Sequence, residues 1–377
     1  MQPYPPYPPA PAPAPMGYPP TAVAPTLPVQ PQLAGRLRTW PALLVLYFLA
    51  PITGEMLSGS TPPLLFLNLV NLIYLPALYG SGAVLARELV RRRGLGWASI
   101  LLLGASYGVL EEGLVVTSWF NPHWPDIGYL GTYGRLFETS WVWALGLTLY
   151  HMVVSIAVPI ILAEALFPRI ADQPWLGHKG GRAFVVWLTI ISLLGLLGFG
   201  FLEFRKQGYT HPPAMYLVAL AFAVALVVLG LRRRPPLPLV PTARSAPRRW
   251  SLRLLGFLAT IIYFTLSWVI PNVIPVALIT MLLFAGCVLF AVWRVRAWSR
   301  RLGWGAEHRL ALASGVLGFF LLLYAPLGEF LAPPAGKPTA GMTLVAVVFL
   351  AGLAWLSRRA GQARIMQQSA IHPPSDC

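Results

Sequence analysis

The sequence predicts an all-α polytopic membrane protein, and three observations lead to this fold class. Of the 377 residues, 56% are hydrophobic and only 11% are charged. An average soluble domain is about a quarter charged, so this chain has too few polar groups to coat a water-facing surface. The apolar residues gather into runs of membrane-spanning length, and most basic residues lie between alternate runs. A soluble globular enzyme is therefore excluded.

Ten apolar runs are long enough to cross about 30 Å of hydrocarbon as helices that rise about 1.5 Å per residue. They lie at roughly 39–57, 63–86, 96–118, 139–167, 183–202, 213–231, 252–270, 273–293, 310–331 and 341–357. Pro76 and Pro159 fall inside two of these runs and predict tilt or a kink. Pro271 and Pro275 predict a tight turn between the seventh and eighth runs.

The basic residues predict the topology. With the N-terminus in the cytoplasm, 24 of the 28 Lys and Arg residues fall in inner segments. The outer loops hold the other four, which are Arg135, Arg205, Lys206 and Lys337. This asymmetry obeys the positive-inside rule and predicts a cell-membrane protein with both termini in the cytoplasm. The formal charge of +16 thus reflects topology, and we expect the lipid bilayer, not nucleic acid, as the partner of these residues.

The chain divides into four predicted segments. Residues 1–35 hold 13 prolines and no charged residue, which predicts a disordered cytoplasmic tail that a protein partner could bind. Residues 36–182 contain the first four membrane spans and a polar cluster within the membrane. Residues 183–357 contain six further spans, which read as an apolar scaffold. Residues 358–377 are predicted to form a cytoplasmic C-terminal tail.

The candidate site lies in the third and fourth spans. Ionisable groups cost about 2.5–3.5 kcal/mol each inside a bilayer, so each requires a reason. Glu111 and Glu112 lie in the third span and His151 lies in the fourth, at depths that allow contact. Gly104 and Gly108 form a GxxxG pattern, which predicts close approach of a neighbouring helix. Because adjacent helical residues point about 100° apart, at most one of the two glutamates is expected to face the bundle centre squarely.

Further polar residues could support these three side chains. Thr148 and Ser155 lie three and four residues from His151, on the same helical face. The supporting residues predicted around the site are Asn68, Asn71, Tyr107, Thr148 and Ser155.

Several functions remain open for a buried Glu/His cluster. A carboxylate and an imidazole suit general acid/base work on a water, and hence an intramembrane hydrolase. They also suit a proton-coupled transporter or carrier. A third reading is a non-catalytic membrane scaffold in which the cluster only joins helices. No cofactor is predicted, although Glu111, Glu112 and His151 could also hold a divalent metal ion.

The pair Glu111-Glu112, followed by a histidine on the next span, resembles the intramembrane peptidases of the CAAX-protease and bacteriocin-processing type. The resemblance implies that Glu111 or Glu112 activates water and that His151 matches the first histidine of that family. It covers about 45 residues, and the chain departs from the family pattern around it. Val116 stands where the family has Arg, and Leu147 stands where it has an aromatic residue. Only His178 and His211, both in predicted loops, follow His151 closely, so a second histidine motif is not found.

Overall fold

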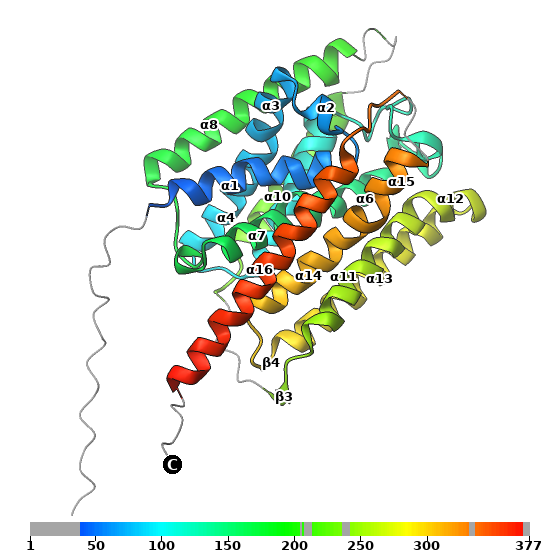
Figure 1. Cartoon of the computed structure of the whole chain (residues 1–377). Coiled ribbons are helices and arrows are strands. Elements are labelled where there is room, and N and C mark those ends of the chain that lie inside the picture. Colours follow the sequence, from blue (N-terminus) through cyan, green and yellow to red (C-terminus); the bar gives the residue numbers. More distant parts are fainter. Residues whose placement is uncertain (1–37, 204–205, 207–212, 236–241, 332–335, 372–377) are drawn as a thin grey trace, which may run out of the picture. The chain divides into compact units, whose positions relative to one another are not determined.

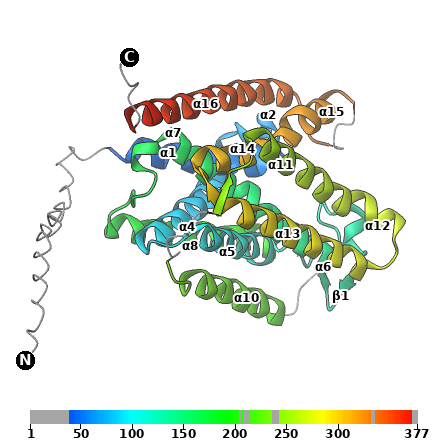
Figure 2. The same cartoon turned by 90° about the horizontal axis from the view of Figure 1, so that it is seen from below.

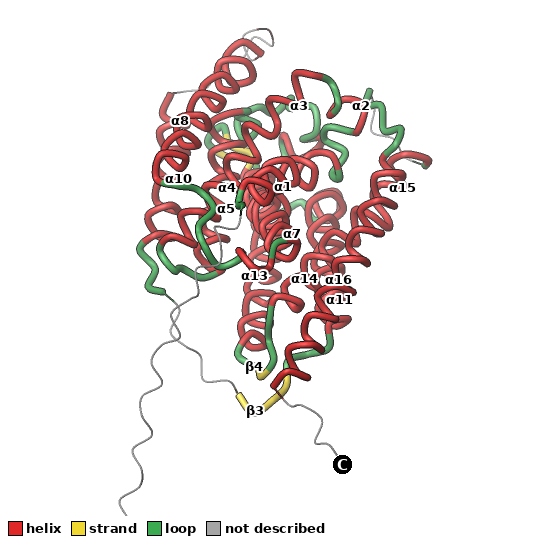
Figure 3. Tube along the Cα trace, turned by 60° about the vertical axis from the view of Figure 1, so that its left-hand side comes forward, coloured by secondary structure: helices red, strands yellow, loops and turns green. Residues whose placement is uncertain are grey.

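The computed structural model describes residues 38–203, 206, 213–235, 242–331 and 336–371, with the backbone alone for Ala243 and residues 363–371. The predicted Pro-rich tail, residues 1–35, lies outside the described residues. The described chain is a helical bundle in which strands occur only as two short pairs (Figures 1 and 3). The predicted all-α membrane bundle is therefore confirmed.

The helices of the first four spans are interrupted by short π-helical segments, labelled η like the 3₁₀ turns. Their elements are α1 (Trp40–Pro51), η1 (Ile52–Met56), α2 (Pro63–Phe66), α3 (Leu69–Leu75), η2 (Pro76–Gly80), α4 (Ser81–Arg92), α5 (Trp97–Val109), η3 (Leu110–Val115), η4 (Gly128–Gly131), β1 (Arg135–Leu136), β2 (Thr139–Ser140), α6 (Trp141–Tyr150), η5 (His151–Ala157), α7 (Val158–Leu166) and η6 (Pro168–Ile170).

The remaining elements form six further long helices and one strand pair. They are α8 (His178–Gly195), η7 (Leu196–Glu203), α10 (Pro213–Leu231), β3 (Thr242–Ser245), α11 (Arg249–Phe264), η8 (Thr265–Val269), α12 (Ile270–Val273), α13 (Ala277–Ser299), β4 (Arg301–Leu302), α14 (Ala306–Phe319), η9 (Phe320–Tyr324), α15 (Ala325–Phe330) and α16 (Met342–Ile371).

Each of the ten predicted spans corresponds to an apolar helix. Within the described residues, nine continuous helices have the length and hydropathy to cross a membrane. The tenth, Trp40–Met56, is apolar but shorter than the other nine.

Several boundaries differ from the predicted ones. The second span begins at Leu69, because the Asn68 side chain accepts a hydrogen bond from the Asn71 backbone N–H and caps the helix. It ends at Arg92 and not at residue 86. The last helix continues to Ile371, through much of the segment predicted as a C-terminal tail.

The proline-rich turn between the seventh and eighth spans is also placed differently. The seventh helix runs from Arg249 to Val273 and includes Pro271. The turn itself is residues 274–276, before α13 begins at Ala277. The helix accommodates the missing N–H of Pro271 by forming the π-helical segment η8 just before it.

The centre of the bundle is built mainly from the first half of the chain. The share of buried residues is 72% in the span Trp97–Val115 and 61% in Trp141–Leu166, but only 11% in Ala277–Ser299. The span Ala306–Phe330 is the exception in the second half, at 56%. Figure 2 shows α10 at the edge of the bundle, beside α5. The second half thus supplies most of the outer surface.

Proline accounts for most of the π-helical segments. Pro51 directly precedes η1 and Pro76 begins η2. Pro159, Pro271 and Pro326 each follow a π segment, η5, η8 and η9 respectively, by two residues. A proline removes one helical hydrogen bond and crowds the preceding turn, and widening that turn relieves the crowding. Where Pro76 and Pro159 predict tilt or a kink, the helix therefore changes locally from α to π.

Candidate functional site

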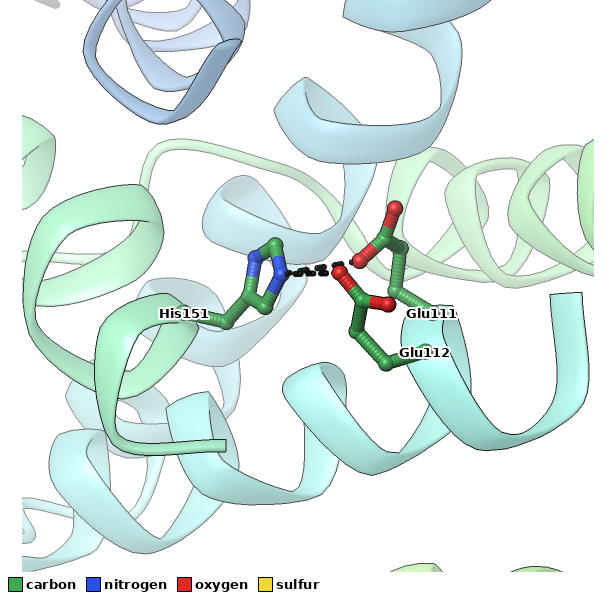
Figure 4. A group of neighbouring side chains, drawn as sticks. All are labelled: Glu111, Glu112 and His151. Carbon is green, nitrogen blue, oxygen red and sulfur yellow. Dashed lines mark hydrogen bonds and ion pairs between the residues drawn. The ribbon is translucent and has the colours of Figure 1, made fainter. Parts of the chain in front are cut away.

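His151 contacts both predicted carboxyl groups. Its Nε2 lies 2.9 Å from Oε2 of Glu111 and 3.0 Å from Oε1 of Glu112. Figure 4 shows the imidazole of His151 pointing across to the two carboxyls on the facing helix. The three residues are 2–7% exposed. Because Nε2 carries at most one proton, the two carboxyls compete for a single N–H donor.

Both glutamates reach the histidine because they lie on a π-helical segment. Glu111 and Glu112 belong to η3, and His151 begins η5. A π turn holds more residues than an α turn, so neighbouring side chains diverge by a smaller angle. The expectation that only one glutamate faces the bundle centre assumed an α-helix and does not hold here.

Two glycines bring the helix of the glutamates against the helix of the histidine. A Cβ built on Gly104 would lie 3.0 Å from the Met152 carbonyl oxygen, and one on Gly108 would lie 3.0 Å from the His151 Cβ. Larger side chains at these positions would push the helices apart. The GxxxG pattern therefore produces the close approach predicted for it.

The other ring nitrogen of His151 meets Ser155, one of the predicted supporting residues. The Nδ1 and the Ser155 Oγ are 3.0 Å apart, so the hydroxyl helps to fix the ring orientation. Tyr107 packs against the same ring, with centroids 6.1 Å apart. Ser155 and Tyr107 therefore both contact the imidazole ring.

Three predicted supporting residues make their hydrogen bonds elsewhere. The Thr148 hydroxyl donates to the Ala144 carbonyl of its own helix at 2.8 Å. Asn68 caps α3, and the Asn71 amide donates to the Leu65 carbonyl at 2.9 Å. Asn68 is exposed. None of these three side chains forms a hydrogen bond with the cluster, because their polar ends find partners on their own segments.

Ser118 and Trp143 lie beside Glu112, and no pattern in the sequence marks either residue for this role. The Ser118 hydroxyl donates a short hydrogen bond to Oε2 of Glu112. The Trp143 indole N–H donates to the Ser118 oxygen at 2.9 Å. Ser118 lies past the end of η3, where the chain turns back toward the helix.

A third carboxyl joins the cluster through a tyrosine. The Tyr79 hydroxyl lies 2.5 Å from Oε1 of Glu55 and 3.1 Å from Oε1 of Glu111. Thr61, in the loop after η1, donates to the other Glu55 oxygen at 2.7 Å. The sequence marks Glu55 only as an acid near the end of the first span. Tyr79 is one of 14 tyrosines and carries no distinguishing pattern.

Four π-helical segments therefore meet at one place. Glu55 lies on η1 and Tyr79 on η2, while the two adjacent glutamates lie on η3 and His151 lies on η5. π-Helical turns in proteins occur frequently at functional sites. Their convergence marks this cluster as a candidate site.

Some polar atoms around the cluster have no hydrogen-bond partner among the described residues. They are the hydroxyls of Tyr74 and Tyr107 and the Oε2 of Glu111, which is near His151 but receives no hydrogen bond. All three atoms are buried. Buried polar groups normally form hydrogen bonds, so these atoms are available to a water or a bound group.

Comparison with known proteins supports the membrane assignment. A model of an uncharacterised membrane protein family matches residues 44–370. The chain belongs to this family. No curated protein and no solved structure matches the chain. The matching family is not that of the intramembrane peptidases, so the resemblance to those peptidases is unconfirmed.

In this family member, the same three side chains could also hold a metal ion. Glu111, Glu112 and His151 each offer a ligand atom, and these atoms all lie within 4.8 Å of one another. One imidazole nitrogen and two carboxylate oxygens are donors that zinc and other divalent ions accept. Within the described part of the chain, this is the one such group of three.

Proposed function

We propose that this membrane protein is an intramembrane hydrolase of the peptidase type, with Glu111, Glu112 and His151 as its catalytic groups. One observation carries the proposal: a single imidazole nitrogen faces two carboxylates at 2.9 and 3.0 Å, deep in the bundle. No Lys or Arg of the described residues forms an ion pair with these carboxylates. Packing alone does not require three ionisable groups in one buried place, since they are costly there.

The geometry supports acid/base chemistry on a water molecule. A carboxylate takes one proton from a water, whose oxygen attacks a substrate carbonyl carbon. The imidazolium of His151 then gives a proton to the departing nitrogen as the carbon–nitrogen bond breaks. Ser155 holds the imidazole ring at Nδ1, so Nε2 stays directed at the carboxylates. The unbonded hydroxyl of Tyr107 is a donor for the carbonyl oxygen.

A cavity lies near the cluster, although none of the three catalytic groups lines it. It has a volume of about 250 Å³ and is lined mainly by apolar atoms, including the side chains of Trp143 and Tyr150. Trp143 is linked to Glu112 through Ser118, and the Tyr150 ring lies 5.4 Å from that of His151. Trp143 and Tyr150 therefore both line the cavity and contact the surroundings of the candidate site.

The experiment is to reconstitute the full-length protein in liposomes with a panel of fluorogenic transmembrane peptides. We expect cleavage by the native protein and a loss of about 10²–10⁴-fold in Glu111→Gln, Glu112→Gln or His151→Ala, as for removal of a general acid or base. Asp172→Asn is the matched control for the two glutamate variants. It removes the same charge from a side chain that is 92% exposed and lies away from the site. If the three variants cleave as fast as the native protein, the catalytic assignment is wrong.

A specific observation also favours a proton-coupled carrier as the second candidate. Tyr79 joins Glu111 to Glu55, and Glu55 continues to Thr61 in a loop, so hydrogen bonds run from the cluster toward one end of the bundle. The same liposomes, loaded with a pH-sensitive dye, test this function. Proton or solute flux that Tyr79→Phe abolishes, without any peptide cleavage, would favour the carrier. Absence of both activities would favour a non-catalytic scaffold.

We also propose that the protein resides in the cell membrane with both termini in the cytoplasm, as the positive-inside distribution of basic residues requires. Reporter fusions at either terminus test the orientation. A second test places single cysteines in the loops of a Cys287→Ser, Cys377→Ser variant. Labelling of a cysteine at His123 from outside intact cells, and of one at Arg300 only after permeabilisation, is expected, because both side chains are exposed. The reverse pattern would invert the topology.

A further inference from the structure

We propose that the cavity beside Arg248 and Arg249 binds the phosphate group of an anionic phospholipid. This cavity has a volume of about 290 Å³ and lies at the start of α11. Its lining consists of Ser245, Ala246, Pro247, Arg248, Arg249, Leu302 and His308. The proposal is independent of the function proposed for the Glu/His cluster.

The floor of the cavity is held by the strand pair β3 and β4. The Thr242 N–H donates to the Arg300 carbonyl at 2.9 Å, and the Ala246 N–H donates to the Leu302 carbonyl at 2.8 Å. These bonds tie the segment before α11 to the segment before α14. The arginines thus project from a fixed backbone.

Two helices begin beside the cavity and bring their N-termini together. A Cβ built on Gly256 would lie 2.5 Å from the Leu312 carbonyl oxygen, so α11 and α14 approach very closely. Arg248 and Arg249 start α11, while His308 lies in the first turn of α14. The N-terminus of α11 presents N–H groups and a partial positive charge, which favour an anion, whereas the first turn of α14 already contains Glu307.

Within the described residues, no ion pair joins Arg248 or Arg249 to an acidic side chain. No acidic residue lies in the first turn of α11, and none of the described lining residues is acidic. Between Arg232 and Arg309 the sequence holds one acid, Glu307, whose carboxylate lies 3.5 Å from His308 Nδ1. Two arginines at a helix N-terminus are unfavourable without an anion, and guanidinium groups bind phosphate oxygens well. An anion bound here would relieve this repulsion.

An exposed apolar stripe favours a lipid over a free phosphate ion. On α11, directly after the two arginines, Trp250, Leu254, Leu258 and Ile262 follow at intervals of four residues and are 39–58% exposed. Residues four apart lie on one helical face. If the phosphate of a lipid lies in the cavity, its acyl chain can therefore lie along this apolar face of α11. Basic pockets next to membrane helices bind anionic headgroups in this manner.

The experiment uses the full-length protein in nanodiscs of phosphatidylcholine with increasing phosphatidylglycerol, and native mass spectrometry counts the phosphatidylglycerol retained per protein. We expect the native protein to retain phosphatidylglycerol in preference to phosphatidylcholine. Arg248→Gln with Arg249→Gln should weaken that retention about 30-fold, from loss of two basic contacts. Arg232→Gln with Arg233→Gln makes the same charge change at two exposed arginines outside the cavity and should change retention little.

A second arm uses inorganic phosphate alone in a phosphatidylcholine nanodisc. Binding of inorganic phosphate as strong as that of phosphatidylglycerol, or equal loss of retention in both double variants, would overturn the lipid assignment. Unchanged retention in the cavity variant would do the same. Because the double substitution could impair folding, Arg249→Gln alone is measured as well, together with thermal unfolding, and a partial loss at native stability supports the site.

Discussion

Gly108 lies directly against His151. A Cβ built on this glycine would be 3.0 Å from the Cβ of the histidine, tighter than nearly all such contacts. The helix that carries the glutamates therefore approaches the helix that carries the imidazole this closely because residue 108, like residue 104, has no side chain. The geometry of the candidate site depends on this contact as much as on its ionisable groups.

The first prediction concerns this contact. Gly108→Ala should lower the free energy of unfolding by about 1–3 kcal/mol, because the added methyl overpacks a tight interface. Gly286→Ala is the control, since a Cβ at Gly286 meets nothing within 4 Å. Thermal unfolding in detergent measures both. Equal melting temperatures for the two variants would show that the helices can separate at little cost.

The second prediction concerns Ser118, which links Glu112 to Trp143. Ser118→Ala removes an acceptor for the indole and a donor to the carboxylate, so both partners lose a buried hydrogen bond. We expect a loss of about 1–3 kcal/mol in stability. Trp143→Phe removes only one of the two bonds. A double-mutant cycle of the two substitutions should give a coupling of about 0.5–3 kcal/mol, and additive effects would contradict the observed link.

The third prediction concerns the Tyr79 hydroxyl between Glu55 and Glu111. One hydroxyl has one proton, so for both contacts to be hydrogen bonds one carboxyl must donate to the tyrosine oxygen. Tyr79→Phe should destabilise the protein by about 1–3 kcal/mol, since it leaves buried carboxyl oxygens without a partner. Tyr129→Phe, at a 52% exposed tyrosine, should have no measurable effect.

The fourth prediction concerns Arg87, a fully buried charge in the middle of α4. Its guanidinium pairs with Glu164 at 3.1 Å, donates to the Ala171 carbonyl at 2.5 Å and lies 3.3 Å above the Trp175 ring. Arg87→Ala should cost about 1–3 kcal/mol, because the backbone carbonyls that Arg87 contacts lose a buried donor, while Glu164 keeps its ion pair with Arg91 at 2.6 Å. Lysine should rescue little, since it lacks the planar fork that fits these partners. Arg93→Ala, at an exposed residue, is the control; a similar loss there would contradict the prediction.

Much of the fold follows from composition and spacing. The ten apolar runs predict ten helices because a continuous apolar run of about 20 residues crosses hydrocarbon as a helix, which satisfies its own backbone hydrogen bonds. Helix ends were less predictable: Asn68 caps a helix by its own local geometry, and α16 continues to Ile371 through polar residues. Proline positions indicated irregular helices, but only the backbone shows that the irregularity is π-helical.

The sequence by itself determined that lipid surrounds this chain and that Glu111, Glu112 and His151 are its candidate reactive groups, because ionisable residues are rare and costly in apolar runs. Only the tertiary structure decided that both glutamates meet one imidazole nitrogen and that Glu55, Tyr79 and Ser118 extend the cluster. Those contacts join segments far apart in the chain. They depend on close glycine contacts and on π-helical turns. These features set the directions of the side chains, which the regular periodicity of an α-helix does not predict.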